Sequence, residues 1–86
     1  MNNWTVYILR CADSSLYTGI TKDLMQRLVA HNAGQGARYT RAHLPVTLVW
    51  SKAGLSGSAA RQEEARIKSL TKAEKERITR ISAGEL

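Results

Sequence analysis

The chain has a single cysteine, Cys11, so it cannot form an intrachain disulfide. No segment approaches the run of about 20 apolar residues that a membrane-spanning helix needs. The N-terminal stretch 1–11 has no basic region, and its apolar run is far too short for a signal peptide. The single cysteine excludes a fold held by intrachain disulfides, and the lack of a long apolar run excludes a membrane-spanning helix. They predict a cytoplasmic protein with no membrane partner.

Acidic residues are also scarce. Seven Asp and Glu stand against 13 Lys and Arg, which gives a net charge of +6 and a pI near 10.0. Such an excess attracts polyanions through counterion release and long-range steering. Nucleic acid is therefore the predicted partner, with an acidic membrane surface and a merely basic small protein as alternatives. No protein partner can be predicted.

Repeats and low-complexity tracts are absent, and 43% of the 86 residues are hydrophobic. One compact domain over residues 1–82 is expected, followed by a short tail at 83–86. A domain of this size buries only about 60–65% of its unfolded surface. Any site must therefore lie on an open face or in a shallow groove.

Two apolar segments near the N-terminus predict a β-hairpin. Residues 4–11 and 16–20 are rich in aromatic, β-branched and aliphatic side chains, and the ADSS stretch at 12–15 is typical of a turn. The first segment carries apolar residues at both odd and even positions, which predicts a strand that is covered on both faces.

Each predicted strand carries one tyrosine, Tyr7 or Tyr17. In a regular antiparallel ladder these two side chains share a face only if paired residue numbers have an even sum. That condition requires an odd-length loop, such as 12–14, or a compensating bulge at Gly19.

The next segment predicts a helix that Thr21 caps and Gly34 ends. Its apolar stripe is expected to consist of Leu24, Met25, Leu28 and Val29, with Ile20 and Met25 forming a hydrophobic staple. Arg27 and His31 lie one turn apart and so share a face at the edge of this stripe.

The remaining chain predicts a basic loop, a strand and two helices. The predicted bounds are a loop at 34–45, a strand at 46–51, a loop at 52–58, a helix at 58–70 capped by Ser58, and a helix that opens with the capping box at 71–74 and has Ile78 and Ile81 on one side. The order strand, strand, helix, strand, helix, helix is that of a small α+β domain.

The strands and the first helix can bring together four side chains with useful chemistry: Tyr7, Tyr17, Arg27 and His31. A phenol or an imidazole can move a proton, and an arginine can clamp a phosphate oxygen. A carboxylate from the second helix, Glu63 or Glu64, can hold a hard cation with waters. Each residue alone has an ordinary structural explanation, but together they suit metal-assisted phosphodiester hydrolysis.

The order and spacing of these residues resemble the GIY-YIG nuclease superfamily, and especially its small stand-alone bacterial members. The resemblance covers nearly the whole chain. The matching segments are VYIL at 6–9, YTG at 17–19, TKDLMQRLVAHN at 21–32, GARYT at 36–40, LPVTLVW at 44–50 and ARIKSLTKAEKERI at 65–78. The first motif departs from the family pattern in lacking its glycine and isoleucine, and the second has Thr18 in place of isoleucine.

The resemblance implies a three-stranded antiparallel sheet flanked by about three helices in the order β-β-α-β-α-α. It implies an endonuclease that hydrolyses DNA phosphodiester bonds with a divalent cation, Mg²⁺ first and Mn²⁺ as the alternative. Tyr7 and Tyr17 are expected to orient water or accept a proton. Arg27 is expected to stabilise charge on the phosphate, and His31 to transfer a proton or contact the phosphate.

The resemblance implies one metal-binding glutamate, and either Glu63 or Glu64 could fill that position. On a helical wheel Glu63 falls within the apolar stripe, whereas Glu64 falls outside it and near Ala60 and Ile67. Glu64, three residues before Ile67, also fits the small bacterial members better, so it is the predicted ligand. Contacts to nucleic acid are expected from Arg38, Tyr39, Arg41 and Lys68.

Two other hypotheses compete with a nuclease. A basic nucleic-acid-binding module without catalysis would use the same cationic residues and stack bases on exposed aromatic rings. A zinc site formed by Cys11, His31 and His43 is the second, although these spacings match no zinc pattern.

Overall fold

The structure is a computed structural model that describes residues 2–84, with side chains as far as Arg80. Its elements are β1 (Trp4–Arg10), β2 (Leu16–Thr21), α1 (Leu24–Asn32), α2 (Arg38–Arg41), β3 (Thr47–Leu55), α3 (Gly57–Lys68) and α4 (Lys72–Gly84). The strands form one antiparallel sheet in the order β2-β1-β3, so the predicted α+β architecture is confirmed. Only the one-turn helix α2 was not predicted.

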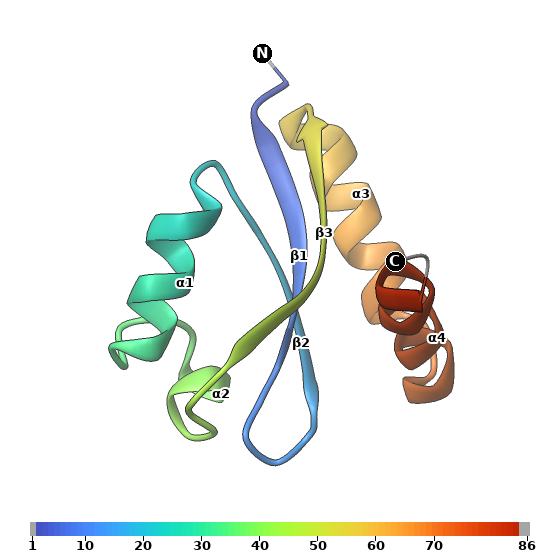
Figure 1. The fold of residues 1–86 in the computed structure, drawn as a ribbon. Helices are drawn as coiled ribbons and strands as arrows, with labels where there is room; N and C mark the ends of the chain where they lie inside the picture. The colour runs from blue at the N-terminus through green and yellow to red at the C-terminus, as the bar shows by residue number, and fades with distance from the viewer. Residues whose placement is uncertain (1, 85–86) are drawn as a thin grey trace.

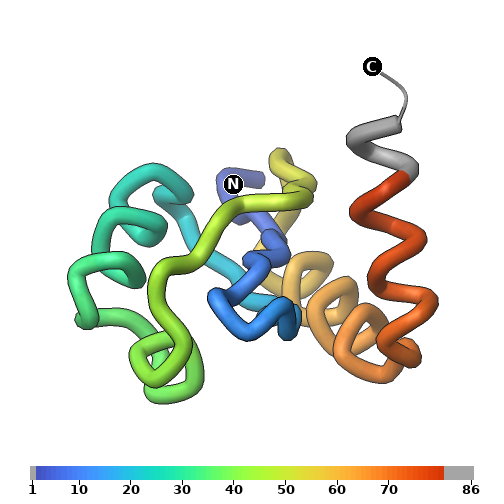
Figure 2. Tube along the Cα trace, turned by 60° about the horizontal axis from the view of Figure 1, so that its bottom comes forward, coloured from blue at the N-terminus to red at the C-terminus, as the bar shows by residue number. Residues whose placement is uncertain are grey.

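Helices cover both faces of this sheet. Helices α1 and α2 lie on one side and α3 and α4 on the other (Figure 1), and the turned view shows the same three layers (Figure 2). Side chains of β1 alternate between two apolar clusters. Val6 packs with Ile67 of α3, whereas Tyr7 packs with Leu28 of α1. The central strand is thus buried on both faces, as its continuous apolar run predicts.

The hairpin between β1 and β2 has a regular register. Tyr7 pairs with Gly19 and Leu9 pairs with Tyr17, so paired numbers have an even sum throughout. A hydrogen bond from the Cys11 amide to the Ser15 carbonyl, 2.8 Å long, closes a three-residue loop. No bulge occurs at Gly19. The prediction that Tyr7 and Tyr17 share a face is confirmed.

The start of α1 was predicted wrongly. Asp23, not Thr21, is the N-cap, and its carboxylate accepts a hydrogen bond from the Gln26 amide at 3.1 Å. Thr21 still pairs with Thr5 in the sheet, and its hydroxyl accepts from the Asp23 amide at 3.1 Å. Strand pairing with β1 therefore delays the helix by two residues.

The apolar stripe of α1 is narrower than predicted. Leu24 and Leu28 pack against the core, but Met25 and Val29 are 70% and 68% exposed, so the staple between Ile20 and Met25 does not form. The predicted end is confirmed in position, because Gly34 follows the C-cap with a φ of 79°, a left-handed conformation that favours glycine.

Two further boundaries differ from prediction. Strand β3 continues to Leu55, which pairs with Trp4, and Gly54 accommodates the register shift there with a φ of 77°. Ser56, rather than Ser58, caps α3 by accepting from the Ala59 amide at 3.0 Å. A strand end is set by its partner strand, which local sequence does not reveal.

The last helix agrees with its predicted start. Thr71 and Glu74 exchange the two hydrogen bonds of a capping box, 2.9 and 3.2 Å long. Ile78 packs against the core, while the side chain of Ile81 lies outside the described residues. Helix α4 extends to Gly84, and positions 85–86 of the predicted tail lie outside the described residues. Along the described chain, no helix is long and apolar enough to cross a membrane.

Candidate active site

Tyr7 reaches across the edge strand of the sheet. It lies on β1, directly opposite Gly19 of β2, and is almost fully buried. A Cβ atom at position 19 would lie 2.6 Å from the Tyr7 hydroxyl oxygen and 2.7 Å from Cζ. Glycine is therefore required here because the phenol passes directly over its backbone. This close approach carries the hydroxyl across β2, the edge strand of the sheet.

His31 meets this hydroxyl from α1. Its Nε2 atom lies 3.0 Å from the Tyr7 hydroxyl, and its Nδ1 atom lies 2.8 Å from the Thr40 hydroxyl of α2. The side chain is 0% exposed, and both ring nitrogens have partners. Gly36 packs against the same ring, since a Cβ there would lie 2.2 Å from Nδ1. The imidazole is thus fixed in position between the sheet and the loop after α1.

Aromatic rings continue from His31 toward α2. Tyr17 packs edge-on against His31, with ring centroids 5.6 Å apart, and stacks on Tyr39 at 6.4 Å. Tyr39 in turn stacks on His43 at 4.5 Å, and its hydroxyl donates to Ser15 at 2.5 Å. The rings join the hairpin to α2, so residues of α2 are held next to the Tyr7–His31 pair.

Two further residues of the candidate site, Arg27 and Glu64, influence the pKa of Tyr7. Burial raises the pKa of Tyr7 above its ordinary value, and hydrogen bonding and charge from the Arg27 guanidinium oppose that shift. Coulombic repulsion between the ionised forms of Tyr7 and Tyr17, and the negative charge of Glu64 on α3, raise the pKa of Tyr7 further. Burial also lowers the pKa of His31, with Arg27 adding to the effect. The neutral imidazole and neutral phenol are therefore the favoured forms.

The two candidate glutamates of α3 have different surroundings. Glu63 forms two hydrogen bonds to Arg66, 2.8 and 2.9 Å long, and lies 3.8 Å from the Lys52 ammonium group. The Arg66 hydrogen bonds hold the pKa of Glu63 below its usual value. Glu64 has one ion pair, 3.2 Å long, with Lys68. Of the two, Glu64 is the one whose charge acts on the pKa of Tyr7.

The predicted nucleic-acid contacts lie on two elements. Arg38, Tyr39 and Arg41 lie on α2, beside the aromatic rings described above. Lys68 lies in the last turn of α3, where it pairs with Glu64. Tyr39 therefore stacks on Tyr17 beside the Tyr7–His31 pair, Arg38 and Arg41 are exposed on the same one-turn helix, and Lys68 adjoins the carboxylate.

The donor set suits a hard cation held by one carboxylate. Magnesium is typically bound through one or two carboxylates, with waters and substrate phosphate completing its shell. Glu64 offers such a carboxylate, and its ion pair with an exposed lysine is of a kind worth only about 0–1 kcal/mol. Within residues 2–80, no three His, Cys, Asp or Glu side chains gather as a metal cluster. The zinc hypothesis is therefore wrong: Cys11 is buried in the core, and His31 uses both ring nitrogens elsewhere.

Sequence reasoning missed the importance of Thr40 and Gly36. Both lie within the GARYT segment, which was treated as a basic loop, yet both contact the His31 ring. The signal in the sequence was a glycine and a small hydroxyl residue a few positions after the histidine. Nothing local shows that this loop folds back over the helix.

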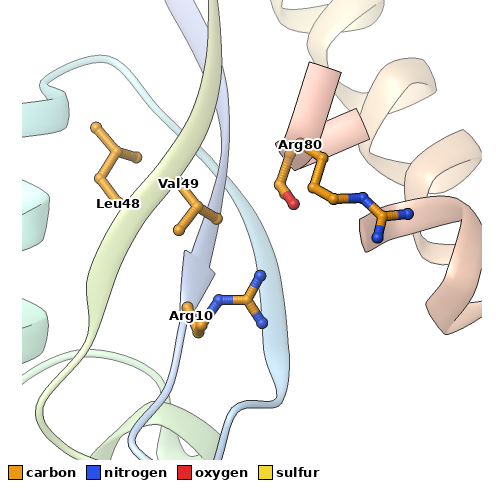
Figure 3. A pocket seen from close by; sticks show the side chains of 5 residues that line it. Arg10, Leu48, Val49 and Arg80 are labelled. Carbon is orange, nitrogen blue, oxygen red and sulfur yellow. The ribbon is translucent and has the colours of Figure 1, made fainter. Parts of the chain in front are cut away.

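A cavity of about 340 Å³ lies away from this site, between β3 and α4 (Figure 3). Arg10, Val49 and Arg80 are among its lining residues, and Arg10 is tied to Glu76 of α4 by two hydrogen bonds of 2.9 and 2.6 Å. It contains none of the predicted site residues. The candidate site at the edge of β2 is therefore separate from this cavity.

Comparison with known proteins agrees with this geometry. Residues 3–77 match the family model of the GIY-YIG catalytic domain. UPF0213 protein NP_0776A of Natronomonas pharaonis is 49% identical over 79 residues, which are 92% of this chain and 93% of that protein. A UPF0213 protein of Cronobacter sakazakii is 45% identical over 86 residues, which are 100% of this chain and 87% of that protein.

The fold is also similar to a solved relative. The solution NMR structure of UPF0213 protein BH0048 from Bacillus halodurans gives a TM-score of 0.60 at 41% identity, covering 94% of this chain and 85% of that one. The family match, rather than the names of these relatives, carries the functional inference. By sequence and by fold, this chain belongs to the GIY-YIG catalytic domain family, a superfamily of nuclease-type phosphodiester hydrolases.

Proposed function

We propose that this protein is a metal-dependent endonuclease that hydrolyses DNA phosphodiester bonds. The observation that carries the proposal is the environment of one hydroxyl group. The Tyr7 oxygen lies 3.0 Å from His31 Nε2, and both the Arg27 guanidinium and the Glu64 carboxylate act on its pKa. The phenol is thus bonded to a possible proton acceptor, and its pKa responds to a cation that could bind phosphate and to a carboxylate that could hold a metal.

The Tyr7–His31 pair supplies a path for the proton that leaves the attacking water. As the Tyr7 oxygen takes a proton from water, its own proton passes to His31 Nε2 along the 3.0 Å hydrogen bond. The resulting hydroxide forms a bond to phosphorus while the bond to the leaving oxygen breaks, and that oxygen takes a proton from solvent. A neutral imidazole is required for this step, and the lowered pKa of His31 favours it. Tyr17, edge-on to His31, helps to orient the water.

Arg27 and Glu64 act on charge. The guanidinium of Arg27 stabilises the negative charge that grows on the phosphate oxygens. Glu64 would hold Mg²⁺, or Mn²⁺, and the bound cation supplies further neutralisation of that charge. If Glu64 held the cation, Lys68, which pairs with Glu64 in this structure, would be free to bind a DNA phosphate. The cations of α2, Arg38 and Arg41, would contact the DNA backbone, with Tyr39 between them.

One assay tests the proposal directly. The protein is incubated with single-stranded, duplex, nicked and branched DNA in the presence of Mg²⁺ or Mn²⁺, and in parallel with a chelator. We expect cleavage of at least one substrate with metal and none with chelator. Arg27→Ala should lose cleavage, while Arg77→Ala, which removes an exposed arginine on α4, should retain it.

Binding without cleavage would favour the alternative, a non-catalytic nucleic-acid-binding module. The net charge of +6 and the arginines of α2 would serve such a module equally well. Binding alone, however, requires no buried phenol–imidazole pair. We also propose that the protein acts in the cytoplasm, where its one thiol stays reduced.

A further inference from the structure

Thr40 contacts the proton acceptor from the side opposite Tyr7. Its side chain is 0% exposed, and its hydroxyl oxygen has two partners: the Ala37 carbonyl oxygen at 2.9 Å and His31 Nδ1 at 2.8 Å. A hydroxyl carries one proton, and a carbonyl oxygen can only accept. Thr40 must therefore donate its proton to Ala37 and accept one from His31. This accounting places the ring proton on Nδ1.

The position of that proton decides what the other nitrogen can do. In a neutral imidazole only one nitrogen carries a proton, so protonated Nδ1 leaves Nε2 with a free lone pair. That lone pair points at the Tyr7 hydroxyl, 3.0 Å away, and can only accept from it. In the opposite tautomer, Nδ1 would have to accept the one Thr40 proton, so Thr40 would lose its hydrogen bond to Ala37, and the Tyr7 proton would no longer have His31 as its acceptor.

We propose that Thr40 is a positioning residue that holds His31 in the Nδ1-protonated tautomer and so makes Nε2 the proton acceptor for Tyr7. The inference deepens the proposed nuclease function and rests on it only for the consequence in catalysis. Every buried side-chain nitrogen and oxygen in the described part of the chain has a hydrogen-bond partner, so no unsatisfied group competes for the Thr40 hydroxyl.

The surroundings of His31 leave few ways to replace this hydrogen bond. Backbone at Gly36 lies directly against Nδ1, and a side chain there would overlap the ring. The titratable and charged groups that act on the pair are Arg27 from α1, Tyr7 from β1, Tyr17 from β2 and Glu64 from α3. None of these takes the place of Thr40, because none is hydrogen-bonded to Nδ1.

The test is the tautomer itself, read by long-range ¹H–¹⁵N NMR correlations of His31 at about pH 8, where an ordinary histidine is neutral. We expect the Nδ1-protonated form in the wild-type protein and in Thr40→Ser, which keeps the hydroxyl. Thr40→Val should shift His31 toward a mixture of tautomers. The matched control is Thr79→Val, which removes another buried threonine hydroxyl, one that donates to the Glu76 carbonyl at 2.8 Å on the far side of the sheet.

An Nε2-protonated ring in the wild-type protein would overturn the proposal without any variant, even if Thr40→Val failed to fold. An unchanged tautomer in folded Thr40→Val would overturn it too. On a cleaved DNA, Thr40→Val should lower kcat by about tenfold to a hundredfold, and Thr40→Ser should restore it. If no DNA is cleaved, the nuclease proposal fails, and the NMR result still decides the role of Thr40.

Discussion

The hydroxyl group of Tyr7 and the backbone of Gly19 share a space that has no room for one more methyl group. A Cβ at position 19 would lie 2.6 Å from that oxygen, and Tyr7 is 1% exposed. Gly19 is thus as much a part of the candidate site as the side chains around it.

Gly19→Ala should therefore displace Tyr7 and lower the free energy of unfolding by about 1–3 kcal/mol, the usual range for overpacking. Urea denaturation measures the loss. In a Tyr7→Leu background, where the ring is gone, the same substitution should have a much smaller effect. Equal losses in both backgrounds would show that the close approach is not the cause.

Arg27→Ala should reduce cleavage about a hundredfold, or about 3 kcal/mol, because a charge-assisted donor matters most in the transition state. DNA affinity, measured with chelator present, should change far less than kcat. A variant that bound DNA weakly and kept its rate on bound DNA would make Arg27 a simple binding residue.

Glu64→Gln should abolish metal-dependent cleavage, since the amide keeps the shape and removes the charge that a hard cation needs. Metal-free DNA binding should stay equal or improve, because a repelling carboxylate is gone. The control is Glu63→Gln, which weakens the ion pairs with Arg66 and Lys52 but should keep most of the activity. If Glu63→Gln were the inactive variant, Glu63 would be the ligand instead.

DNA affinity should fall steeply and log-linearly with salt concentration if phosphate neutralisation drives binding. Replacing Arg38 or Arg41 with Gln should lower that slope by about one unit if the arginine binds a phosphate group. Arg77→Gln on α4 is the comparison, and it should leave the slope unchanged. An affinity that ignored salt would contradict a backbone-binding surface on α2.

The stability of the fold should depend on pH through His31. Burial, together with the Arg27 charge, lowers the pKa of His31, so below about pH 6.5 the unfolded chain binds more protons than the folded one. The stability that depends on a neutral His31 is fully present above about pH 6.5, and it is lost as the pH falls through the lowered pKa of folded His31. In urea titrations at about pH 7.5 and pH 5, wild type should lose more stability on acidification than His31→Gln. A parallel loss in His31→Gln would contradict this assignment.

The parts of this fold that were predictable depend on neighbours in the chain. The hairpin parity follows from the loop between Cys11 and Ser15, and the capping box of α4 follows from the sequence of Thr71 and Glu74. The start of α1 was misplaced because Thr21 is recruited into the sheet by Thr5, sixteen positions earlier. How far two strands stay paired depends on residues that are distant in sequence. The end of β3 was misplaced for the same reason, because Leu55 pairs with Trp4.

Candidate residues could be selected from the sequence, whereas their connections could not. Tyr7, Arg27, His31 and Glu64 were selected by chemistry, spacing and family resemblance. The structure joins Tyr7 to His31 by a hydrogen bond, and Arg27 and Glu64 act on the pKa of Tyr7. That Thr40 bonds to the back of His31 depends on how the loop after α1 folds over, and no periodicity encodes this. Glu63 and Glu64 are adjacent in sequence, and only their partners in space separate them.

The register between β1 and β2, which the three-residue loop closes, decides which face of the sheet carries Tyr17. Side chains on β2 alternate between the α1 face and the α3 face, so a slip of one residue in its pairing with β1 would turn Tyr17 away from His31. A slip of two residues would bring a β2 side chain of the same parity back to that face. The placement of Tyr17 beside His31 thus depends on a strand register that a loop of three residues closes.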